Sequence, residues 1–403
     1  MTSAGDAPAL QFRARPTKCL MLKVAIICGA GIVSGKEIMA LELAEGLRDK
    51  DCAVELITSF WGNGEFRRRS HAAGFPTHIM RLGFISATLN LECLRMTAHQ
   101  LLFWPTLLRS YKRFLKNVRP AKVIHTNWHH VLLLWPLLRP HRDIYWSHEV
   151  FADKPQYGRL FCALANRVGR LIAVSQAAAQ SLLKLGVPSN KVVVIYNGID
   201  DPAAAEPIRQ ENEVPVIGIV GQIGSWKGHE DLLDAFQMLL QTQPSAQLHI
   251  FGRAASTYEA FLRSRAHDLG VNSRVVWRGF VEDHSKIYVG LSTLVVPSRS
   301  EDTLPTSAIE AGFFGVPVVA SRRGGLPEIV QDRVTGLLFE TGNVQQLAQH
   351  LRTLLSDAEL RNNMGRKARE RATSLFGRDR FVREFCEILE LKSSNVAATS
   401  SIG

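Results

Sequence analysis

Apolar runs typical of buried strands alternate with glycine-bearing turns and amphipathic helices along most of the chain. The first unit is the Val- and Ile-rich run Leu20–Cys28, then a glycine loop, the periodic stretch Glu37–Leu47 and a second strand, Ala53–Thr58. The spacing predicts that this helix turns Ile38, Leu41, Leu43, Ala44 and Leu47 inward. The same order restarts at Val216–Val220. Such units build parallel sheets covered by helices, so we expect an α/β chain with two doubly wound, Rossmann-like domains.

The length of 403 residues also favours two domains of about 200 residues each. A Pro-, Ala- and Glu-rich stretch without apolar period, 201–215, is predicted to be the linker between them. The expected limits are an N-terminal domain at 20–200, a C-terminal domain at 216–376, a final helix at 377–392, a disordered tail at 1–19 and a small, polar tail at 393–403.

The positive charge of the chain lies almost entirely in its first half. Residues 1–200 carry 26 Lys and Arg against 13 Asp and Glu, and residues 201–403 carry 22 against 24. We therefore expect the N-terminal half to face something anionic, with nucleic acid, an anionic membrane surface and an acidic sugar substrate all open. No nucleic-acid-binding module is recognisable, which ranks that partner low.

Six scattered cysteines without a C-x-x-C pair indicate a reducing, cytoplasmic setting. Residues 1–17 do not resemble a secretory signal, and no apolar run reaches the ~20 residues that a membrane-spanning helix needs. We expect a soluble protein, or one peripheral on the cytoplasmic face of a membrane.

The stretch Leu101–Arg119 is predicted to be a basic amphipathic helix. Its apolar positions at helical spacing are Trp104, Leu107, Leu108, Tyr111, Phe114 and Leu115. The basic residues between them are Arg109, Lys112, Arg113, Lys116 and Arg119. A helix of this kind either lies on an anionic membrane or packs its apolar stripe on the domain core, and the pattern alone leaves both open.

Candidate site residues follow the ends of predicted strands, where open α/β sheets bind ligands. In the C-terminal half they are Lys227 ahead of a helix, the acidic Glu301, Asp302 and Glu310, the helix start Thr306-Ser307, and Gly324-Gly325. In the N-terminal half they are Gly35, His148 and Asn197-Gly198, although a lone histidine is more often structural. A cation, free amides and carboxylates suit an organic diphosphate that carries hydroxyls. The sequence shows no cluster of carboxylates of the kind that a Mg²⁺ site uses, so we do not expect the site to depend on a metal ion.

The glycine loop 29–35 fits neither of two familiar phosphate motifs. A dinucleotide fingerprint expects an acid after the next strand, which ends Thr58-Ser59, and a Walker loop expects Ser or Thr after Lys36, where Glu37 stands. Two interpretations of this loop stay open. It is either a glycine turn whose amides approach a phosphate or a tight turn without a ligand.

Together these motifs resemble the retaining GT-B-fold glycosyltransferases of family 4, the glycosyl transferases group 1. The motifs are Lys227-Gly228 after a glycine-bearing loop, Asp302-x7-Glu310, and the glycine loop Gly324–Glu328. Weaker landmarks are Ser34–Glu37, Asn197–Asp200 and Gly279-Phe280. The resemblance runs from about Leu20 to Leu391 and implies two domains facing across a cleft, with the last helix crossing back to the N-terminal domain.

The resemblance also implies a role for each site residue. Lys227 and the amides of Thr306 and Ser307 would bind the donor diphosphate, on which the loop at Gly35 closes. Glu310 would hold the ribose hydroxyls, and Asp302 or Glu301 those of the donor sugar. His148 would lie beside the reacting sugar. Gln222, Gly279, Phe280, Gly324 and Gly325 complete the nucleotide-sugar-binding set, and the catalytic set is His148, Lys227, Asp302 and Glu310.

Three positions depart from the family pattern. Gln222 stands where the family has Arg, Gly252-Arg-Ala254 replaces G-x-G, and Glu-Asp-Thr-Leu-Pro replaces the usual E-G-F-G. The choice of nucleotide and donor sugar therefore stays open.

The implied function is metal-independent, retaining transfer from a nucleotide-diphosphate sugar to a glycan or lipid-linked acceptor, without a further cofactor. Cell-surface polysaccharide, lipopolysaccharide or glycolipid synthesis is the expected setting. The alternatives are a sugar-nucleotide epimerase or phosphorylase on the same scaffold, and a non-enzymatic basic binding protein.

Overall fold

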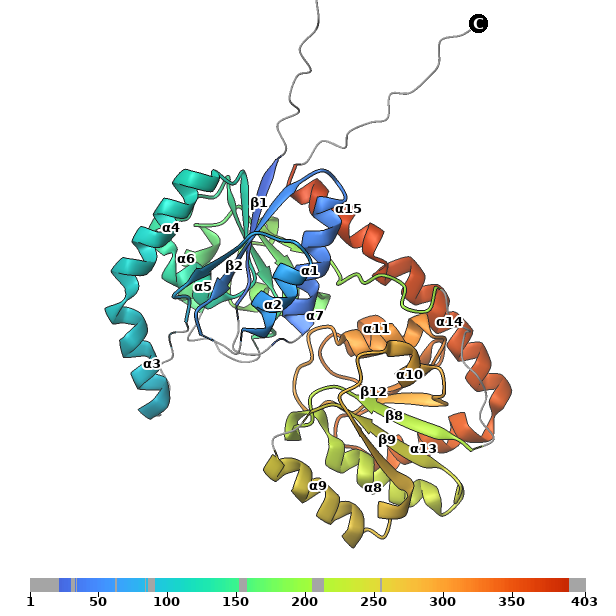
Figure 1. Cartoon of the computed structure of the whole chain (residues 1–403). Helices are drawn as coiled ribbons and strands as arrows, with labels where there is room; N and C mark the ends of the chain where they lie inside the picture. The colour runs from blue at the N-terminus through green and yellow to red at the C-terminus, as the bar shows by residue number, and fades with distance from the viewer. Residues whose placement is uncertain are drawn as a thin grey trace, which may run out of the picture.

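The computed structural model of the chain describes residues 22–29, 33, 35–61, 64–83, 85, 91–151, 158–204, 214–253 and 256–390. The predicted tails and most of the predicted linker lie outside these residues, as do Ser34 and the middle of the glycine loop. Figure 1 shows two lobes, each with a central sheet between helices, and a long C-terminal helical segment running from one lobe to the other.

Seven parallel strands form the N-terminal sheet in the order β3-β2-β1-β4-β5-β6-β7. They are β1 (Lys23–Ile27), β2 (Ala53–Ser59), β3 (Thr77–Met80), β4 (Lys122–His125), β5 (Asp143–Ser147), β6 (Arg170–Ala173) and β7 (Val192–Val194). The α-helices of this part are α1 (Gly35–Arg48), α2 (Glu65–Ala72), α3 (Leu91–Leu102), α4 (Trp104–Val118), α5 (Trp128–Leu133), α6 (Gly158–Ala165) and α7 (Gln176–Lys184).

Six parallel strands form the C-terminal sheet in the order β10-β9-β8-β11-β12-β13. They are β8 (Val216–Val220), β9 (Gln247–Phe251), β10 (Val275–Gly279), β11 (Thr293–Val296), β12 (Val318–Ser321) and β13 (Gly336–Phe339). Its α-helices are α8 (His229–Leu240), α9 (Ser256–Asp268), α10 (His284–Tyr288), α11 (Thr306–Phe313), α12 (Leu326–Ile329), α13 (Val344–Ser356) and α14 (Ala358–Phe376), and α15 (Arg378–Ile388) follows. The expected pair of doubly wound sheets is confirmed.

Both sheets are buried on both faces, which explains their continuous apolar strands. In β1, Val24 and Ile26 belong to one hydrophobic cluster while Ala25 and Ile27 belong to the cluster on the opposite face. Successive side chains of a strand point to opposite faces, so a strand covered on both sides needs apolar residues at every position. In each sheet the strand order reverses beside the first strand, at β1/β4 and at β8/β11. Ligands bind at such switch points in open α/β sheets.

The last helix packs on the N-terminal domain, as the resemblance implies (Figure 1). A Cβ at Gly46 of α1 would overlap Val382 of α15, so the two helices touch where α1 has no side chain. Phe381 and Phe385 pack beside the fully buried Trp146 at the end of β5, with ring centroids 5.8 and 4.9 Å away. This apolar contact attaches the end of the chain to its first domain.

The inward face of α1 differs from the prediction at one position. Ile38 is 40% exposed, whereas Met39, Leu43 and Leu47 are fully buried. These three lie at i, i+4 and i+8 on one face, and Ile38 lies about 100° round the helix from Met39. The prediction placed Ile38 one step off the true stripe.

The predicted helix Leu101–Arg119 is two helices. Phe103 separates α3 from α4, and Pro105 occupies the first turn of α4, where its missing N–H costs no helical hydrogen bond. Leu107, Tyr111 and Phe114 are buried against the N-terminal sheet. The structure therefore favours the second interpretation of the apolar stripe, in which it packs on the domain core.

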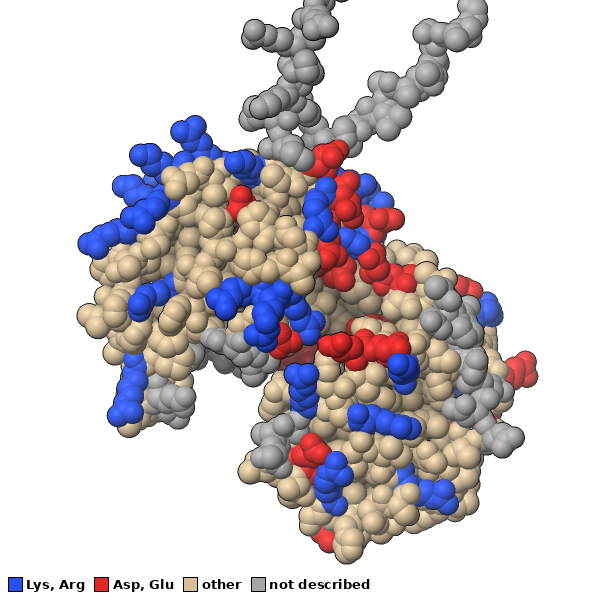
Figure 2. Space-filling model, viewed as in Figure 1, with Lys and Arg blue, Asp and Glu red and all other residues tan. Residues whose placement is uncertain are grey.

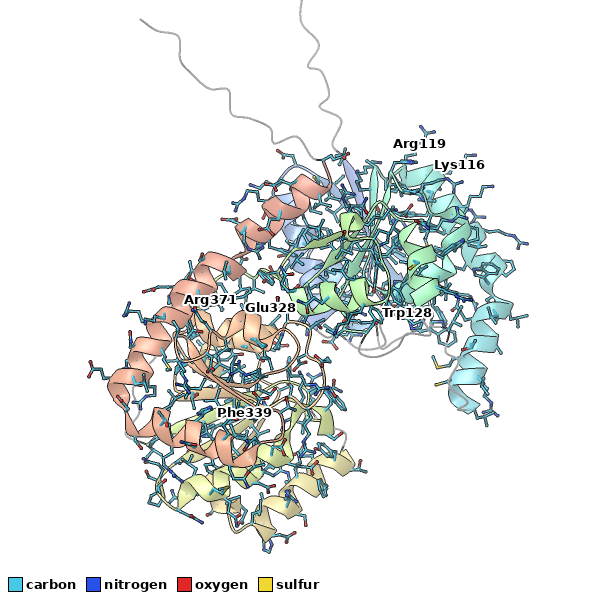
Figure 3. All side chains as sticks on the ribbon, turned by 180° about the vertical axis from the view of Figure 1, so that it is seen from behind. Lys116, Arg119, Trp128, Glu328, Phe339 and Arg371 are labelled. Atoms are coloured by element: carbon cyan, nitrogen blue, oxygen red, sulfur yellow. The ribbon has the colours of Figure 1, made fainter. Side chains whose placement is uncertain are left out.

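The basic residues of α4 remain on its outer face. Arg109, Lys112, Arg113, Lys116 and Arg119 are exposed. Figure 2 shows a basic edge over α4, and in Figure 3 Lys116 and Arg119 lie at the outer margin of this domain. In the part of the chain that the structure describes, no helix is both long and apolar enough to cross a bilayer.

Candidate functional site

Lys227 is presented by a short loop at the switch point of the C-terminal sheet. The chain leaves β8, forms a single 3-10 turn over Ser225–Lys227, and enters α8 through Gly228. Gly228 has a φ of 71°, and a Cβ there would overlap the carbonyl oxygen of Pro297 at the end of β11. Glycine is required because α8 starts so close to the neighbouring strand.

The Lys227 ammonium makes a two-pronged ion pair with Asp302. Its Nζ lies 2.8 Å from both Oδ1 and Oδ2 of the carboxylate. Both side chains are about one-fifth exposed, so solvent and ligands reach them. Ser298 donates its hydroxyl to Oδ2, which orients the carboxylate from the end of β11. The cation expected to bind diphosphate is thus held by a carboxylate of the neighbouring loop.

Gly324 and Gly325 lie directly against this acidic loop. The amide of Gly325 donates to the carbonyl of Asp302 at 2.8 Å. Gly324 has a φ of 57°, and a Cβ on either glycine would overlap the backbone of residues 302–303. The two predicted glycines let the loops after β11 and β12 pack backbone to backbone.

The structure distinguishes Glu301 from Asp302. Glu301 pairs with Arg323 at 3.2 Å, and Asp302 pairs with Lys227. Of these two acids, only Asp302 contacts Lys227, the cation that is expected to bind the diphosphate. The assignment of either one to the donor sugar stays a prediction.

Glu310 lies on α11, whose first turn holds Thr306 and Ser307. Pro305 occupies the position before this helix and gives its N-terminal amides no side-chain cap. Uncapped amides and the helix dipole favour an anion at such an end. The Glu310 carboxylate is 12% exposed; its Oε2 accepts a hydrogen bond from the Tyr288 hydroxyl at 2.7 Å and lies 3.2 Å from Nδ1 of His284.

Gln222, Gly279 and Phe280 lie on adjoining strand ends. The carbonyl of Gly279 accepts from Gly252 N at 2.8 Å, and Ile223 N donates to the carbonyl of Arg253 at 2.9 Å. Phe280 is 49% exposed, and the Arg253 guanidinium stacks 4.2 Å from its ring centroid. The Gly252-Arg-Ala departure thus adds a cation beside an exposed ring.

His148 links the N-terminal domain to the acidic loop. Its carbonyl accepts a hydrogen bond of 2.9 Å from the Thr303 hydroxyl, next to Asp302. Burial, with a smaller contribution from the positive charge of Lys36, holds the pKa of His148 well below its ordinary value. Its imidazole is therefore neutral at neutral pH, and it packs 4.3 Å from the Trp146 ring. Gly35 begins α1 at the switch point of the same sheet.

A second contact between the domains was not anticipated. The Glu328 carboxylate accepts from the amides of Gln176 and Ala177, at 2.7 and 2.9 Å, in the first turn of α7. Arg371 of α14 donates to the Glu328 carbonyl at 2.6 Å, and Figure 3 shows Arg371 and Glu328 close together where the lobes meet. A carboxylate of one domain thus caps the N-terminus of a helix of the other domain, where the helix dipole attracts negative charge.

Several residues that hold the site in place stand outside any sequence motif. Tyr288, His284 and Ser298 contact Glu310 or Asp302, yet none stands in a recognised motif. Glu328 ends the glycine loop of the family resemblance, which implies no role for its carboxylate. Within the described residues, no three His, Cys, Asp or Glu side chains cluster as metal ligands would.

The chain is similar to known proteins over both domains. Residues 33–201 match the family model described as Glycosyltransferase Family 4, and residues 201–371 the model described as Glycosyl transferases group 1. A D-inositol 3-phosphate glycosyltransferase of Corynebacterium efficiens is 34% identical over 191 residues, which are 45% of this chain and 44% of that protein. The sulfoquinovosyl transferase SQD2 of Arabidopsis thaliana is 30% identical over 212 residues, 49% of this chain and 39% of that protein. The chain spans less than half the length of these two curated relatives.

The fold is also shared with a solved structure, that of Anabaena HepE in complex with UDP and glucose. Its TM-score is 0.75 at 20% identity, over 92% of this chain and 99% of that chain. The two family models together span residues 33–371, and the sheets and returning helix match the GT-B architecture. The chain therefore belongs to the GT-B-fold glycosyltransferases of these two families.

Proposed function

We propose that this protein transfers a glycosyl group from a nucleoside-diphosphate sugar to a glycan or lipid-linked acceptor, in the synthesis of a surface polysaccharide or glycolipid. The observation that carries the proposal is the convergence of Lys227, the uncapped start of α11 and Glu310 at one edge of the C-terminal sheet. The relatives described above are a D-inositol 3-phosphate glycosyltransferase and a sulfoquinovosyl transferase, and the HepE structure is a complex with UDP and glucose. These names support the reaction class and leave the donor and acceptor of this chain open.

In the proposed reaction, Lys227 leaves Asp302 and binds the diphosphate of the donor. The bond between the anomeric carbon and the diphosphate oxygen breaks, and a bond to the acceptor oxygen forms on the same face of the sugar. The acceptor hydroxyl gives its proton to the departing phosphate oxygen. Lys227 and the first amides of α11 stabilise the charge that develops on the diphosphate, where a fixed donor lowers the barrier most.

The other residues hold the substrates. Glu310 would accept hydrogen bonds from the ribose hydroxyls, and Asp302, once released, from hydroxyls of the donor sugar. His148, neutral at neutral pH, would position the sugar on the acceptor side without taking a proton. We further propose that the reaction needs no metal ion, and that it takes place on the cytoplasmic side of a membrane.

Transfer from labelled UDP-, GDP- and ADP-sugars to added acceptor glycans or lipids tests this function. Lys227→Ala is expected to lower the transfer rate by about 10²- to 10³-fold, as for loss of one preorganised oxyanion donor. Glu310→Ala should raise KM for the donor. Lys184→Ala and Glu340→Ala, at exposed residues, are matched controls. Near wild-type transfer by both site variants would remove the assignment.

Three further readouts separate the finer claims. The coupling constant of the anomeric proton in the product shows retention or inversion. Activity that persists in EDTA supports a metal-independent reaction, and full loss in EDTA with rescue by Mg²⁺ contradicts it. Product formed without any acceptor would favour an epimerase.

A further inference from the structure

One carboxylate oxygen of Glu310 is held by two side chains from a single helical turn. Helix α10 is five residues long and carries His284 at its first position and Tyr288 at its last. Residues four apart lie on the same face of a helix, so both side chains reach the same partner. The Tyr288 hydroxyl donates to Oε2 at 2.7 Å, and Nδ1 of His284 lies 3.2 Å from the same atom.

Tyr288 is a rigid and permanently protonated donor. It is fully buried and stacks on Phe314, just beyond the end of α11, with centroids 5.4 Å apart and an interplanar angle of 20°. Burial, followed by the nearby Glu310 charge, raises the pKa of the phenol well above its ordinary value. Its hydroxyl therefore keeps its proton throughout the physiological range. The packing fixes the direction in which that proton points.

His284 is the second donor and, in contrast, is accessible. Its side chain is 46% exposed, and Asp283 caps the helix that carries it by accepting from Ser285 N at 3.1 Å. The hydrogen bond to Glu310 raises the pKa of His284, and the charges of Asp283 and Glu42 add to this effect. Glu42 belongs to α1 of the N-terminal domain, so both domains contribute charge at this imidazole.

We infer that Tyr288 and His284 are positioning residues that fix Oε2 of Glu310, so that Oε1 accepts from a ribose hydroxyl of the donor nucleotide. Among the described residues, Oε1 has no hydrogen-bond donor from the protein, whereas Oε2 has two candidates. A carboxylate anchored through one oxygen presents the other in a fixed direction. The site then selects ribonucleotides over nucleotides that lack the matching hydroxyl. This inference rests on the proposed function.

Equilibrium binding of UDP, GDP and ADP to the full chain, measured by calorimetry, tests the role of Tyr288. Tyr288→Phe removes the hydroxyl and keeps the ring. We expect about tenfold weaker binding of the preferred nucleoside diphosphate, the typical effect of losing a hydrogen bond to a charged group. Binding of its 2′-deoxy or 3′-deoxy analogue, whichever lacks the hydroxyl held by Glu310, should already be weak and should not change further.

Tyr258→Phe is a matched control, because Tyr258 donates to Glu230 at 3.0 Å in the same domain and, within the described residues, makes no hydrogen bond to Glu310. It should bind nucleotide as the wild type does. In transfer assays, Tyr288→Phe is expected to raise KM for the donor and to change kcat little, since Glu310 contacts ribose in the ground state and in the transition state alike.

His284 provides an independent test that the buried tyrosine cannot obscure. If the protonated imidazole holds Glu310, nucleotide affinity should fall as pH rises through the raised pKa of His284. The His284→Ala variant should bind nucleotide weakly at every pH. His284→Asn places an amide donor near the position of Nδ1 and should restore affinity without the pH dependence.

Among the described residues, the titratable groups whose charge acts on His284 are Glu310 from α11, Asp283 at the N-cap of the His284 helix and Glu42 from α1. Burial raises the pKa of Glu42 to about 7, so its charge also changes near neutral pH. Glu42→Gln removes a charge that supports the imidazolium, and it should move the midpoint of the affinity profile to lower pH. It should not flatten the profile, which only the His284 variants do.

The outcomes separate the inference from the function. Wild-type nucleotide affinity in both Tyr288→Phe and His284→Ala, with loss in Glu310→Gln, would overturn the inference and leave the function standing. Equal losses for ribo- and deoxyribonucleotides in Tyr288→Phe would also overturn it. If the wild-type chain binds none of the three nucleoside diphosphates, the proposed function fails and takes the inference with it.

Discussion

The carboxyl edges of the two sheets have the same strand order around the switch point but different chemistry. The C-terminal edge carries paired charges, Lys227 with Asp302 and Glu310 with two donors. The N-terminal edge carries two histidines, the buried His130 and the half-buried His148, and desolvation of the imidazole holds the pKa of each well below its ordinary value. The difference supports the proposal that the C-terminal edge binds a charged diphosphate and its ribose, and that the N-terminal edge binds neutral sugar hydroxyls.

The exposed positive charge of the N-terminal domain lies largely on its helices. One group of basic residues lies on the outer face of α4, and Figure 2 shows another over α2, where Arg67 and Arg68 are exposed. The four predictions below test this division, from the largest expected effect to the smallest.

Rigidity at the C-terminal edge depends on Gly228. Gly228 and Gly270 have the same φ of 71°, but a Cβ at Gly228 would overlap Pro297, while nothing lies within 4 Å of one at Gly270. Gly270→Ala should cost the protein roughly 1 kcal/mol of unfolding free energy, for the left-handed backbone alone. Gly228→Ala should cost several times more by urea denaturation, and equal costs would show that the close contact with β11 does not constrain α8.

The basic face of α4 is proposed to bind anionic lipid by charge alone, since the apolar stripe of the helix is buried. The double change Lys112→Gln with Lys116→Gln should weaken binding to phosphatidylserine-containing liposomes by about 1 kcal/mol for each lysine. The matched change Lys184→Gln with Lys286→Gln, at exposed lysines on other elements, should have no such effect. Equal binding of the wild type to neutral liposomes would contradict this proposal.

The ion pair between Lys227 and Asp302 should compete with diphosphate. Asp302→Asn frees the ammonium, and a partly exposed pair is worth up to about 1 kcal/mol, so UDP, GDP or ADP should bind up to about fivefold tighter. Transfer should nevertheless fall if Asp302 also holds the donor sugar. Ser298→Ala is a milder test, because it loosens the carboxylate without removing its charge. Weaker binding of the nucleoside diphosphate by Asp302→Asn would show that the pair helps to preorganise Lys227.

The contact between Glu328 and α7 should stabilise the arrangement of the two domains. Glu328→Gln weakens a helix cap and should lower the unfolding free energy by about 0.5–1 kcal/mol. Glu340→Gln, which removes an exposed ion pair with Arg322 in the same domain, should cost only a few tenths. Small-angle scattering should show a wider separation of the domains in Glu328→Gln, and unchanged scattering would limit the cap to local stability.

The fold followed from the sequence because buried parallel strands leave a local signal. The run Val216–Val220 was predicted with the observed limits of β8, and the predicted strand Ala53–Thr58 ends one residue before β2 does. Pattern failed where the signal was short or shared: the edge strand Thr77–Met80 was not predicted, and Pro105 was not recognised as a helix start. The exposed Ile38 shows the same limit, since one residue of offset moves a stripe by about 100°.

The candidate site was predictable only as far as its motifs reach. The sequence placed Lys227, Asp302 and Glu310 at strand ends, and the structure brings the first two into contact across 75 residues of chain. The sequence analysis did not predict that Lys227 and Asp302 would form an ion pair with each other. The contacts of Tyr288 and His284 with Glu310 could not be predicted from the sequence. The partners lie 22 and 26 residues apart, and a contact between a short helix and its neighbour leaves no periodic pattern in the sequence. The domain limits and the roles of the site residues stay predictions.

The most direct test of the account is the thermal stability of the wild-type chain with UDP-, GDP- and ADP-sugars, beside Lys227→Ala and Glu310→Ala. A ligand that binds only the folded state raises the free energy of unfolding, by about 2.7 kcal/mol at 100 times its dissociation constant. The melting temperature rises with it. We expect one nucleotide sugar to stabilise the wild type clearly and to stabilise each variant far less at the same concentration. Equal stabilisation of all three proteins would contradict the assignment of the donor site to the C-terminal edge.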